Sequence, residues 1–463
     1  MDTLAHSLTQ AIEADPLNRA LHAELADAMG VAGDETAMMA HRIAVATFDE
    51  IVGASRDPAL EALPLYNVAT VFYMIGRYEE ACRWYRHALN VYPDLAIAHQ
   101  NLAATLEQLG RTDEARVYRS RAYSLQRVFI EPVPKPQRTL LILCSGTAPG
   151  NIPYDTLLSS NRATLVKYAI DYASVEEDAQ LPPYDLVFNA IGEPDVALPM
   201  MSRIAQLTQR CGRPVLNAPE SIASTPRHRM AQLLGALDDI VVPPCMRLEV
   251  APRDTAELMA LLAAQGMTFP VLMRPLATHG GEGLILHTEP ESLLASIQQL
   301  DAPCYVTQYR DFRSADGYYR KYRIVFVDRE PFAYHLAISS HWLVHYVSAD
   351  MPAWPWKLEE EKRFLEDARS ALGERAMNAI VAIGQRLGLD YGGIDFTLLP
   401  DGRVLVFEAN ATMLVHKESA DGVLAHKNAF VQRIVDAFEQ MQIGRMSAGG
   451  GIASGEASAT RTL

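Results

Sequence analysis

The stretch "GGIDFTLLPDGRVLVFEAN", residues 392–410, combines two apolar runs with a compact turn. Pro400-Asp401-Gly402 is a sequence typical of tight turns, and an apolar run on each side of it predicts a β-hairpin. Side chains two positions apart on a strand point to the same face, so Glu408 and Asn410 are expected to project together. The register across the turn can then bring Asp395 of the first strand beside them.

Two carboxylates and one amide on a shared face form a set of hard oxygen ligands. Mg²⁺ binds through a few protein oxygens and keeps other positions for phosphates. We therefore expect Asp395, Glu408 and Asn410 to hold Mg²⁺ or Mn²⁺. The alternative is a surface hairpin whose polar residues face the solvent. The apolar residues around Glu408 favour an inward carboxylate, which requires a compensating cation.

A second stretch, "FPVLMRPLATHGGEGLIL" (residues 269–286), places a cation and a glycine-rich loop between two apolar strands. Two-residue hairpins are usually closed by Asn-Gly or Asp-Gly, and this loop is longer and more flexible than such a hairpin requires. The loop is therefore either an irregular hairpin or a lid.

Together and in their order along the chain, the two stretches resemble the ATP-grasp superfamily, with the closest likeness to glutathione synthetase. The resemblance extends over about residues 139–440 and implies two α+β subdomains that close on ATP. The glycine loop would be a lid whose backbone N–H groups approach the β- and γ-phosphates. Arg274 would replace the strand lysine that contacts the phosphates, keeping its charge and adding a rigid donor fork. The ATP-binding residues expected here are Arg274, His279, Gly280, Gly281 and Gly283.

The same resemblance suggests further ATP-binding residues. "NAPESIASTPRHRM" (residues 217–230) resembles the segment that carries a second phosphate-binding cation. Arg229 is the preferred residue for that role, and Arg227 is the alternative. "YVTQY" (residues 305–309) is similar to the linker that holds adenine, which assigns Gln308 and Tyr309 to the nucleotide site.

The catalytic candidates lie in "DGYYRKYRIVFVDREP", residues 316–331, which resembles the glutathione synthetase strand facing the reaction centre. Arg323 would stabilise the charge that develops as a carboxylate attacks the γ-phosphate. Lys321, two residues earlier on the same face, is the second catalytic candidate. His335 and His341 are candidate substrate residues, with His345 nearby, and a purely structural histidine is the alternative for each of them.

The N-terminal quarter is helical and repetitive. "NVATVFYMIGRYEEACRWYRHAL" from Asn67 and "NLAATLEQLGRTDEARVYRSRAY" from Asn101 share asparagine, alanine, glycine and arginine positions at a spacing of 34 residues. That period resembles tetratricopeptide repeats. A more degenerate unit extends from about Asn18 to Ala46. We expect an all-α repeat solenoid that binds a peptide or partner protein; the alternative is a module that dimerises the protein or shields the enzyme.

Composition shifts predict the domain boundaries. The repeat domain covers residues 1–130, and "EPVPKPQR" (131–138) is predicted to be a proline-rich linker. Alternating strands and helices predict a small α/β domain at 139–218, followed by the α+β region at 219–446. The Gly/Ala/Ser/Thr-rich tail, 447–463, is expected to be disordered. The sequence contains neither the dinucleotide-binding nor the Walker glycine motif.

Charge and cysteine usage limit the classes of partner and compartment. The chain has 463 residues, a net charge of −15 and five cysteines that stand singly. Without a basic cluster, nucleic acid and anionic membranes are not expected as main partners. No apolar run is long enough to span a membrane, and the N-terminus lacks a secretory pattern. A cytoplasmic protein with free thiols is expected.

These patterns predict an ADP-forming ligase behind a helical repeat domain. MgATP would phosphorylate a carboxylate substrate, and an amine would displace phosphate to form an amide. A peptide or carrier protein held by the repeats is one expected substrate, and a small-molecule ligase that forms a homodimer through its helices is the alternative. Two other functions stay open: a non-catalytic scaffold that senses nucleotide, and a small-molecule kinase of the ATP-grasp type.

Overall fold

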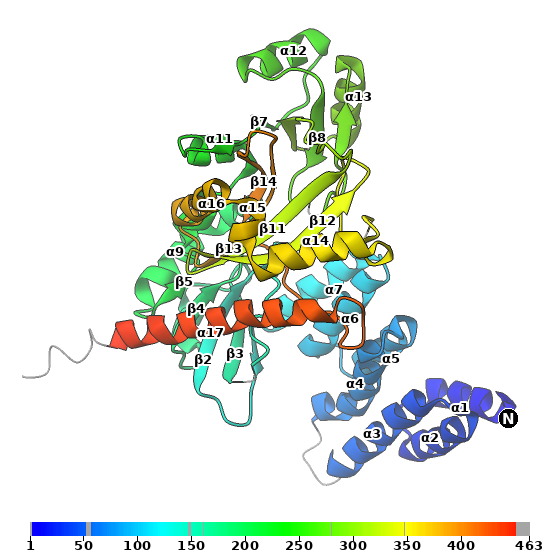
Figure 1. The fold of residues 1–463 in the computed structure, drawn as a ribbon. Coiled ribbons are helices and arrows are strands. Elements are labelled where there is room, and N and C mark those ends of the chain that lie inside the picture. The colour runs from blue at the N-terminus through cyan, green and yellow to red at the C-terminus, as the bar shows by residue number, and fades with distance from the viewer. Residues whose placement is uncertain are drawn as a thin grey trace, which may run out of the picture. The chain divides into compact units, whose positions relative to one another are not determined.

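The computed structural model describes residues 2–51, 57–146, 150–160, 162–278, 280–346 and 348–450 (Figure 1). The chain divides into two compact units, Met1–Phe129 and Ile130–Leu463. The first unit is built of helices up to Leu125, and the second contains three sheets with flanking helices. The expected order of helical repeats followed by mixed α/β structure is confirmed.

The N-terminal unit is built from paired helices. They are α1 (Asp2–Ala14), α2 (Arg19–Ala32), α3 (Glu35–Ile51), α4 (Pro58–Met74), α5 (Tyr78–Val91), α6 (Ala96–Gln108) and α7 (Thr112–Leu125). Gly33, Gly76 and Gly110 stand in the turns within the pairs α2–α3, α4–α5 and α6–α7, with φ of 83°, 81° and 73°. Glycine adopts this left-handed conformation without the strain that a Cβ adds, and it commonly ends helices this way. The 34-residue spacing of Gly76 and Gly110 is thus the spacing of two helix–turn–helix units.

The first sheet of the C-terminal unit has the strand order β1-β3-β2-β4-β5 in the described residues. Its strands are β1 (Val128–Glu131), β2 (Arg138–Cys144), β3 (Ala163–Ala169), β4 (Leu186–Asn189) and β5 (Val215–Leu216). The pairs β2–β3, β2–β4 and β4–β5 are parallel. Strand β4 is buried along its whole length, as expected where helices cover both faces of a parallel sheet. Phe438 of helix α17 (Asn428–Gly450) packs against Phe188 of β4.

The proline-rich segment predicted as an interdomain linker lies inside this sheet. Strand β1 ends at Glu131 and β2 begins at Arg138, so residues 132–137 connect two strands of one sheet. The two units divide earlier, between Phe129 and Ile130. The linker prediction was wrong because the prolines mark an irregular segment but do not reveal the short strand "VFIE" that precedes them.

A second sheet, with the order β7-β10-β8-β9, carries the glycine loop. Its strands are β7 (Cys245–Leu248), β8 (Val271–Pro275), β9 (Ile285–His287) and β10 (Cys304–Gln308), and all neighbours are antiparallel. Helices α12 (Thr255–Ala264) and α13 (Pro290–Leu300) contribute Leu258, Leu262, Leu293 and Ile297 to its hydrophobic core. The loop between β8 and β9 is therefore attached to a well-packed subdomain.

The third sheet has the order β12-β11-β13-β14-β6. Its strands are β6 (Ile240–Val241), β11 (Tyr319–Val327), β12 (Glu330–Ser339), β13 (Tyr391–Leu398) and β14 (Val404–Asn410). Strands β13 and β14 form the predicted antiparallel hairpin, and β6 adds to β14 in parallel. Helices α14 (Pro355–Glu366), α15 (Ala368–Leu372) and α16 (Glu374–Leu387) follow β12 and precede β13 in the chain.

The remaining helices are short except for the last. They are α8 (Pro194–Ala197), α9 (Met201–Arg210), α10 (Pro219–Ala223) and α11 (Met230–Leu234), with 3₁₀ turns η1 (Glu176–Gln180), η2 (Leu198–Met200), η3 (Arg227–Arg229), η4 (Met351–Ala353) and η5 (Ala425–Lys427). Helix α17 runs through Gly450, so the tail predicted to be disordered from residue 447 begins with four helical residues. Its later residues, 451–463, lie outside the described part.

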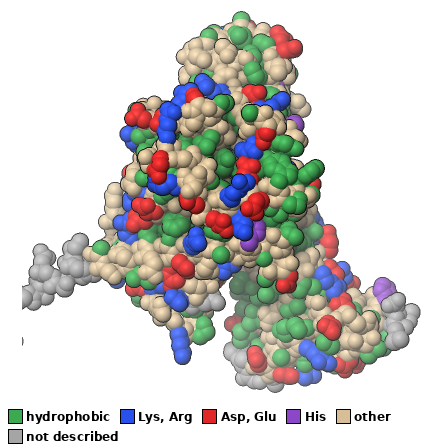
Figure 2. All heavy atoms as spheres, viewed as in Figure 1, with side chains coloured by type: hydrophobic (Ala, Val, Ile, Leu, Met, Phe, Trp, Pro, Cys, Tyr) green, Lys and Arg blue, Asp and Glu red, His purple; other side chains and the backbone are tan. Residues whose placement is uncertain are grey.

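The surface carries both signs of charge. On the face shown in Figure 2, lysine and arginine side chains alternate with aspartate and glutamate over the C-terminal unit. Within the described residues, the helices fall short of the combined length and apolar character that crossing a bilayer requires.

Candidate active site

Three neighbouring strands of the third sheet bring charged residues onto one face. Arg323 of β11 is in register with Asp395 of β13, and Asp395 is in register with Glu408 of β14. We call these three residues the charged row. Directly opposed residues share a face of the sheet, so their side chains meet. The β11–β12 ladder shifts register immediately after Arg323, and the β13–β14 ladder immediately after Asp395. Such irregularities occur next to active sites because they re-aim side chains.

Asp395 is the central member of the charged row. Nε and Nη2 of Arg323 donate to its Oδ1 and Oδ2 at 2.6 and 2.8 Å, and Nζ of Lys321 lies 3.4 Å from Oδ2. Burial raises the pKa of this carboxyl, but the charges of Arg323 and Lys321 outweigh burial and hold the pKa of Asp395 well below its usual range. Asp395 is therefore ionised at neutral pH.

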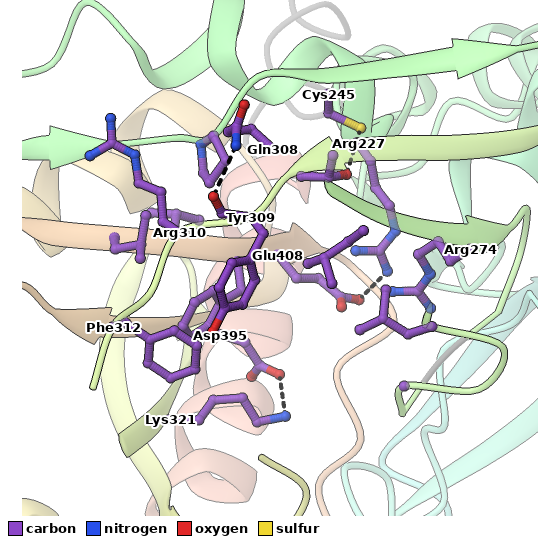
Figure 3. Close-up of a pocket in the computed structure, with 18 of the residues that line it drawn as sticks. Arg227, Cys245, Arg274, Gln308, Tyr309, Arg310, Phe312, Lys321, Asp395 and Glu408 are labelled. Carbon is purple, nitrogen blue, oxygen red and sulfur yellow. Dashed lines mark hydrogen bonds and ion pairs between the residues drawn. The ribbon is translucent and has the colours of Figure 1, made fainter. Parts of the chain in front are cut away.

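Glu408 and Asn410 meet at the end of β14. Oε1 of Glu408 lies 2.8 Å from Nη2 of Arg227, which reaches it from the turn η3 (Figure 3). The amide nitrogen of Asn410 also donates to Oε1 of Glu408, and the amide oxygen accepts from the backbone N–H of Thr412 at 2.9 Å. Through the register of Asp395 with Glu408, the structure brings together the three side chains expected to hold a metal.

The chemistry of these side chains suits a divalent cation. Each carboxylate is ion-paired with an arginine, so a metal would have to replace or share that positive charge at the oxygens of Asp395 and Glu408. In the described parts of the chain, no three His, Cys, Asp or Glu side chains gather into a metal-binding group. A metal would therefore depend on the two carboxylates and the amide of Asn410, and would complete its shell with phosphate and water oxygens, as Mg²⁺ commonly does.

Arg274, at the end of β8, provides a second buried cation near Arg227. It is 8% exposed, and its guanidinium donates to the carbonyl of Thr278 and, at 3.0 Å, to Thr278 Oγ1. Burial and the like charge of Arg227 lower the pKa of Arg274 to about 10. The residue stays cationic at neutral pH, so two arginines from segments far apart in sequence face the same pocket (Figure 3).

The glycine loop follows Arg274 and borders this pocket. Gly280, Gly281 and Gly283 have φ of 62°, 83° and 63°. A Cβ on Gly281 would lie 3.3 Å from Leu343 Cδ1, and one on Gly283 would lie 2.8 Å from Pro275 Cδ. Backbone conformation and close neighbours together therefore favour glycine in this loop. His279, the other residue expected here, lies outside the described residues.

Between the two arginine candidates in the η3 segment, the geometry favours Arg227. Arg227 lines the pocket and binds Glu408, whereas Arg229 is exposed and is not among the pocket residues. A 3₁₀ turn has three residues per turn, so residues two apart point in different directions. The geometry thus supports the alternative, Arg227, over the preferred Arg229, and the phosphate-binding role of either arginine stays a prediction.

The rest of the pocket is mostly apolar and lies between the second and third sheets. Its apolar lining includes Met230, Val242, Pro243, Leu272, Leu405 and Phe407. An apolar slot beside two arginines fits a ligand that joins a flat aromatic group to several negative charges.

The linker after β10 borders the apolar part of the pocket. Oε1 of Gln308 accepts from the N–H of Thr268 at 2.8 Å, and its Nε2 donates to the carbonyls of Pro270 and Tyr309, both at 3.0 Å. Gln308 and Tyr309 both line the pocket, as expected for this linker. The Gln308 amide is already hydrogen-bonded to the backbone, so Gln308 and Tyr309 offer a ligand mainly shape and apolar surface.

The histidine candidates differ in position. His335 is buried in register with Arg323, and burial and the charges of Arg323 and Lys427 hold the pKa of His335 well below its usual range. Its Nε2 has no hydrogen-bond partner within the described chain. His341 is exposed, and its Nδ1 accepts from the N–H of Leu343 at 3.3 Å in its own turn. The structure thus places His335 next to the charged row, whereas the His341 ring bonds within its own turn and is not among the pocket residues. A substrate role for either histidine stays a prediction.

Two parts of the site have no sequence motif. Trp342, Leu343 and Val344 line the pocket, and the Trp342 ring meets the Tyr309 ring at 5.7 Å. Glu193, after β4, is buried within electrostatic reach of Arg227 and Glu408, and burial raises the pKa of Glu193 to about 7. Neither stretch follows a pattern that would have marked it before folding.

Comparison with known proteins identifies part of the chain. Residues 60–127 match the tetratricopeptide repeat family. The matched tetratricopeptide repeats correspond to α4 through α7, where the 34-residue spacing was found. The sequence has no significant match among curated proteins.

Solved structures similar to the chain include ligases. The D-Ala:D-Ser ligase VanG from Enterococcus faecalis is 16% identical, with a TM-score of 0.41 over 66% of this chain and 99% of that one. A RimK domain ATP-grasp protein from Sphaerobacter thermophilus is 16% identical, with a TM-score of 0.39 over 65% and 98%. The D-alanine–D-alanine ligase from Bacillus anthracis is 13% identical, with a TM-score of 0.40 over 67% and 99%. At these TM-scores the similarity assigns no activity.

Proposed function

We propose that the C-terminal unit is an ATP-dependent carboxylate–amine ligase of the ATP-grasp type. The observation that carries the proposal is that Arg227 and Arg274 line one pocket together with Asp395 and Glu408 of the charged row. Arg227 lies 2.8 Å from Glu408 and Arg274 faces the same cavity. Lys321 and Arg323, both on β11, add two cations on the side of Asp395 away from Glu408.

The balance of charge supports a polyphosphate ligand. Arg227, Arg274 and Lys321 line the pocket with the carboxylates of Asp395 and Glu408, and Arg323 adds a fourth cation at Asp395. The other pocket walls are mostly apolar, and electrostatic interactions are stronger there than in water. The base would occupy the slot beside Gln308 and Tyr309, and the phosphates would face Arg227, Arg274 and the glycine loop. A divalent ion held by Asp395, Glu408 and Asn410 would offset phosphate charge.

The proposed reaction has two steps. An oxygen of the substrate carboxylate attacks the γ-phosphorus, the bond from that phosphorus to ADP breaks, and an acyl phosphate forms. The nitrogen of a neutral amine then attacks the acyl carbon, inorganic phosphate leaves, and the amide nitrogen loses a proton. Arg323 and Lys321 would orient the carboxylate and stabilise the charge on the transferring phosphoryl group.

The tetratricopeptide repeats are proposed to hold a peptide or protein that carries the carboxylate or the amine. Helical repeats of this kind stack into extended binding surfaces, which supports this role. Dimerisation through the same helices is the alternative, and removal of the helical unit would distinguish the two roles.

Hydroxylamine trapping tests the proposed activity. The protein is incubated with MgATP, hydroxylamine and pooled carboxylic acids or peptides, and products are analysed by mass spectrometry. A ligase yields ADP together with a hydroxamate of one acid, because hydroxylamine intercepts the acyl phosphate. A stable phosphorylated product that hydroxylamine does not intercept would indicate a kinase. Nucleotide binding with no ADP formed from any pool would indicate the scaffold.

A further inference from the structure

Both carboxylates of the charged row are bound by arginines that would also suit a phosphate. The fork of Arg323 covers both oxygens of Asp395 at 2.6 and 2.8 Å. Arg227 lies 2.8 Å from Glu408 and lines the nucleotide pocket. The two expected metal-binding carboxylates therefore each have a different guanidinium group as their partner.

A divalent ion and a guanidinium group compete for such oxygens. Like charges held within a few ångströms in a partly buried site repel strongly. Arginine binds phosphate as well as carboxylate, with the same planar arrangement of donors. A nucleotide in the pocket would thus offer a new partner to Arg227, which lines the pocket, and to Arg323, whose partner Asp395 lines it. It would do so when the two carboxylates are needed to bind the metal.

The side chains differ in their freedom to move. Asp395 is short, its side chain is 6% exposed, and it is fixed in register between two strands. The Arg323 and Arg227 side chains are 20% and 21% exposed, and each is long with several rotatable bonds. Lys321, 3.4 Å from Asp395, can supply positive charge while Arg323 moves. A change of partners therefore requires the arginines to swing and leaves the strands in place.

We infer that Arg227 and Arg323 are exchangeable counter-ions, which hold Glu408 and Asp395 and pass to phosphate oxygens when nucleotide and metal bind together. This inference rests on the proposed function. Its consequence is that metal and nucleotide each strengthen the binding of the other. Arg323 and Arg227 would thereby act during the binding of metal and nucleotide, before the reaction begins, in addition to any contact with the transferred phosphoryl group.

Binding of Mn²⁺, measured by electron paramagnetic resonance, tests the exchange without any turnover. The wild-type protein should bind Mn²⁺ at least about tenfold more tightly with a non-hydrolysable ATP analogue than without it, which lies within the usual range of such coupling. Arg323→Gln should strengthen Mn²⁺ binding in the absence of nucleotide and reduce that ratio. Arg229→Gln, an exposed arginine outside the pocket, serves as the matched control and should behave as wild type.

A second variant keeps the inference testable if Arg323→Gln unfolds. Asp395→Asn removes the charge that holds Arg323, so the analogue in the presence of a chelator should bind a few-fold more tightly than it binds to wild type. Mn²⁺ binding should be lost in the same variant. Tighter metal-free nucleotide binding is not expected from a simple loss of a metal ligand.

The outcomes separate this inference from the proposed function. If no protein binds the analogue under any condition, the ATP site itself is refuted. If the analogue binds, but Mn²⁺ binds the wild type equally well with and without it, the exchange is refuted and the ligase proposal stands. Unchanged metal-free nucleotide binding in Asp395→Asn would also overturn the exchange.

Discussion

Asp395 and Glu408 stand directly opposite each other on β13 and β14, and each is bound by a different arginine. Arg323 reaches Asp395 from the neighbouring strand β11, while Arg227 reaches Glu408 from the turn η3, almost 200 residues earlier in the chain. One carboxylate is thus held within its sheet and the other by a distant segment.

Replacing Asp395 by asparagine should lower MgATP-dependent ADP formation by about 100-fold or more, since the site loses charge that has to balance phosphate and metal. The variant should stay folded because the amide keeps the shape of the carboxylate. Asp401→Asn, in the exposed turn of the same hairpin, is the control and should keep the wild-type rate. Equal rates in all three proteins would remove Asp395 from the active site.

Arg227→Gln should weaken binding of an ATP analogue by roughly tenfold or more, as expected for the loss of a charged hydrogen bond. Arg229→Gln should change the affinity by less than about twofold because an exposed charge is well screened. Calorimetric titration of both variants measures the difference. A larger effect at Arg229 would reverse the assignment made from the pocket geometry.

Gly281→Ala should impair both stability and activity. The φ of 83° at Gly281 costs an alanine about 1 kcal/mol, and its Cβ would lie 3.3 Å from Leu343 in the pocket wall. Gly212→Ala is the matched control, since Gly212 has a φ of 59° with no atom within 4 Å of the new Cβ. Both variants should lose similar free energy of unfolding, but only Gly281→Ala should raise KM for ATP or lower kcat. Unchanged KM for ATP and kcat in Gly281→Ala would show that the glycine loop takes no part in nucleotide binding.

Glu193 should make folding sensitive to pH. Burial raises its pKa from the model-peptide value of 4.5 to about 7, so the folded state favours the protonated carboxyl. The contribution of Glu193 to the free energy of unfolding is fully present below pH 4.5. It is lost as pH rises through about 7, because the carboxyl ionises at lower pH in the unfolded chain than in the folded protein. A shift of this size corresponds to about 3 kcal/mol.

The measurement compares wild type with Glu193→Gln between pH 4.5 and 8. Buried histidines act in the opposite direction over part of this range, so the difference in free energy of unfolding between the two proteins is the useful quantity. The variant should gain stability relative to wild type as pH rises. A difference that does not change with pH would show that Glu193 titrates normally.

Removing the helical unit should separate substrate binding from assembly. A chain that begins at Arg127 keeps strand β1 in its sheet, whereas a cut at residue 131 would remove it. The shortened protein should bind the ATP analogue as the full chain does, because the pocket residues all lie after residue 226. Loss of reaction with a peptide but not with a small acid would assign the repeats to substrate binding. A change in oligomeric state alone would assign them to assembly.

The amino-acid sequence alone determined the local features of this protein. The period of 34 residues predicts paired helices, and the turn at Pro400-Asp401-Gly402 predicts the hairpin with Glu408 and Asn410 on one face. The glycines of the loop between β8 and β9 are likewise explained by their positive φ. These features are visible in sequence because they arise from interactions between residues close together in the chain.

The tertiary structure alone decided which distant residues meet. The choice of Arg227 over Arg229 depends on the direction of one 3₁₀ turn, and Glu193 and Trp342 reach the site only because separate segments pack against the third sheet. Strand β1 likewise exists because β3 accepts it as a neighbour. Such contacts follow from the packing of whole elements, and no spacing of residues along the chain records them.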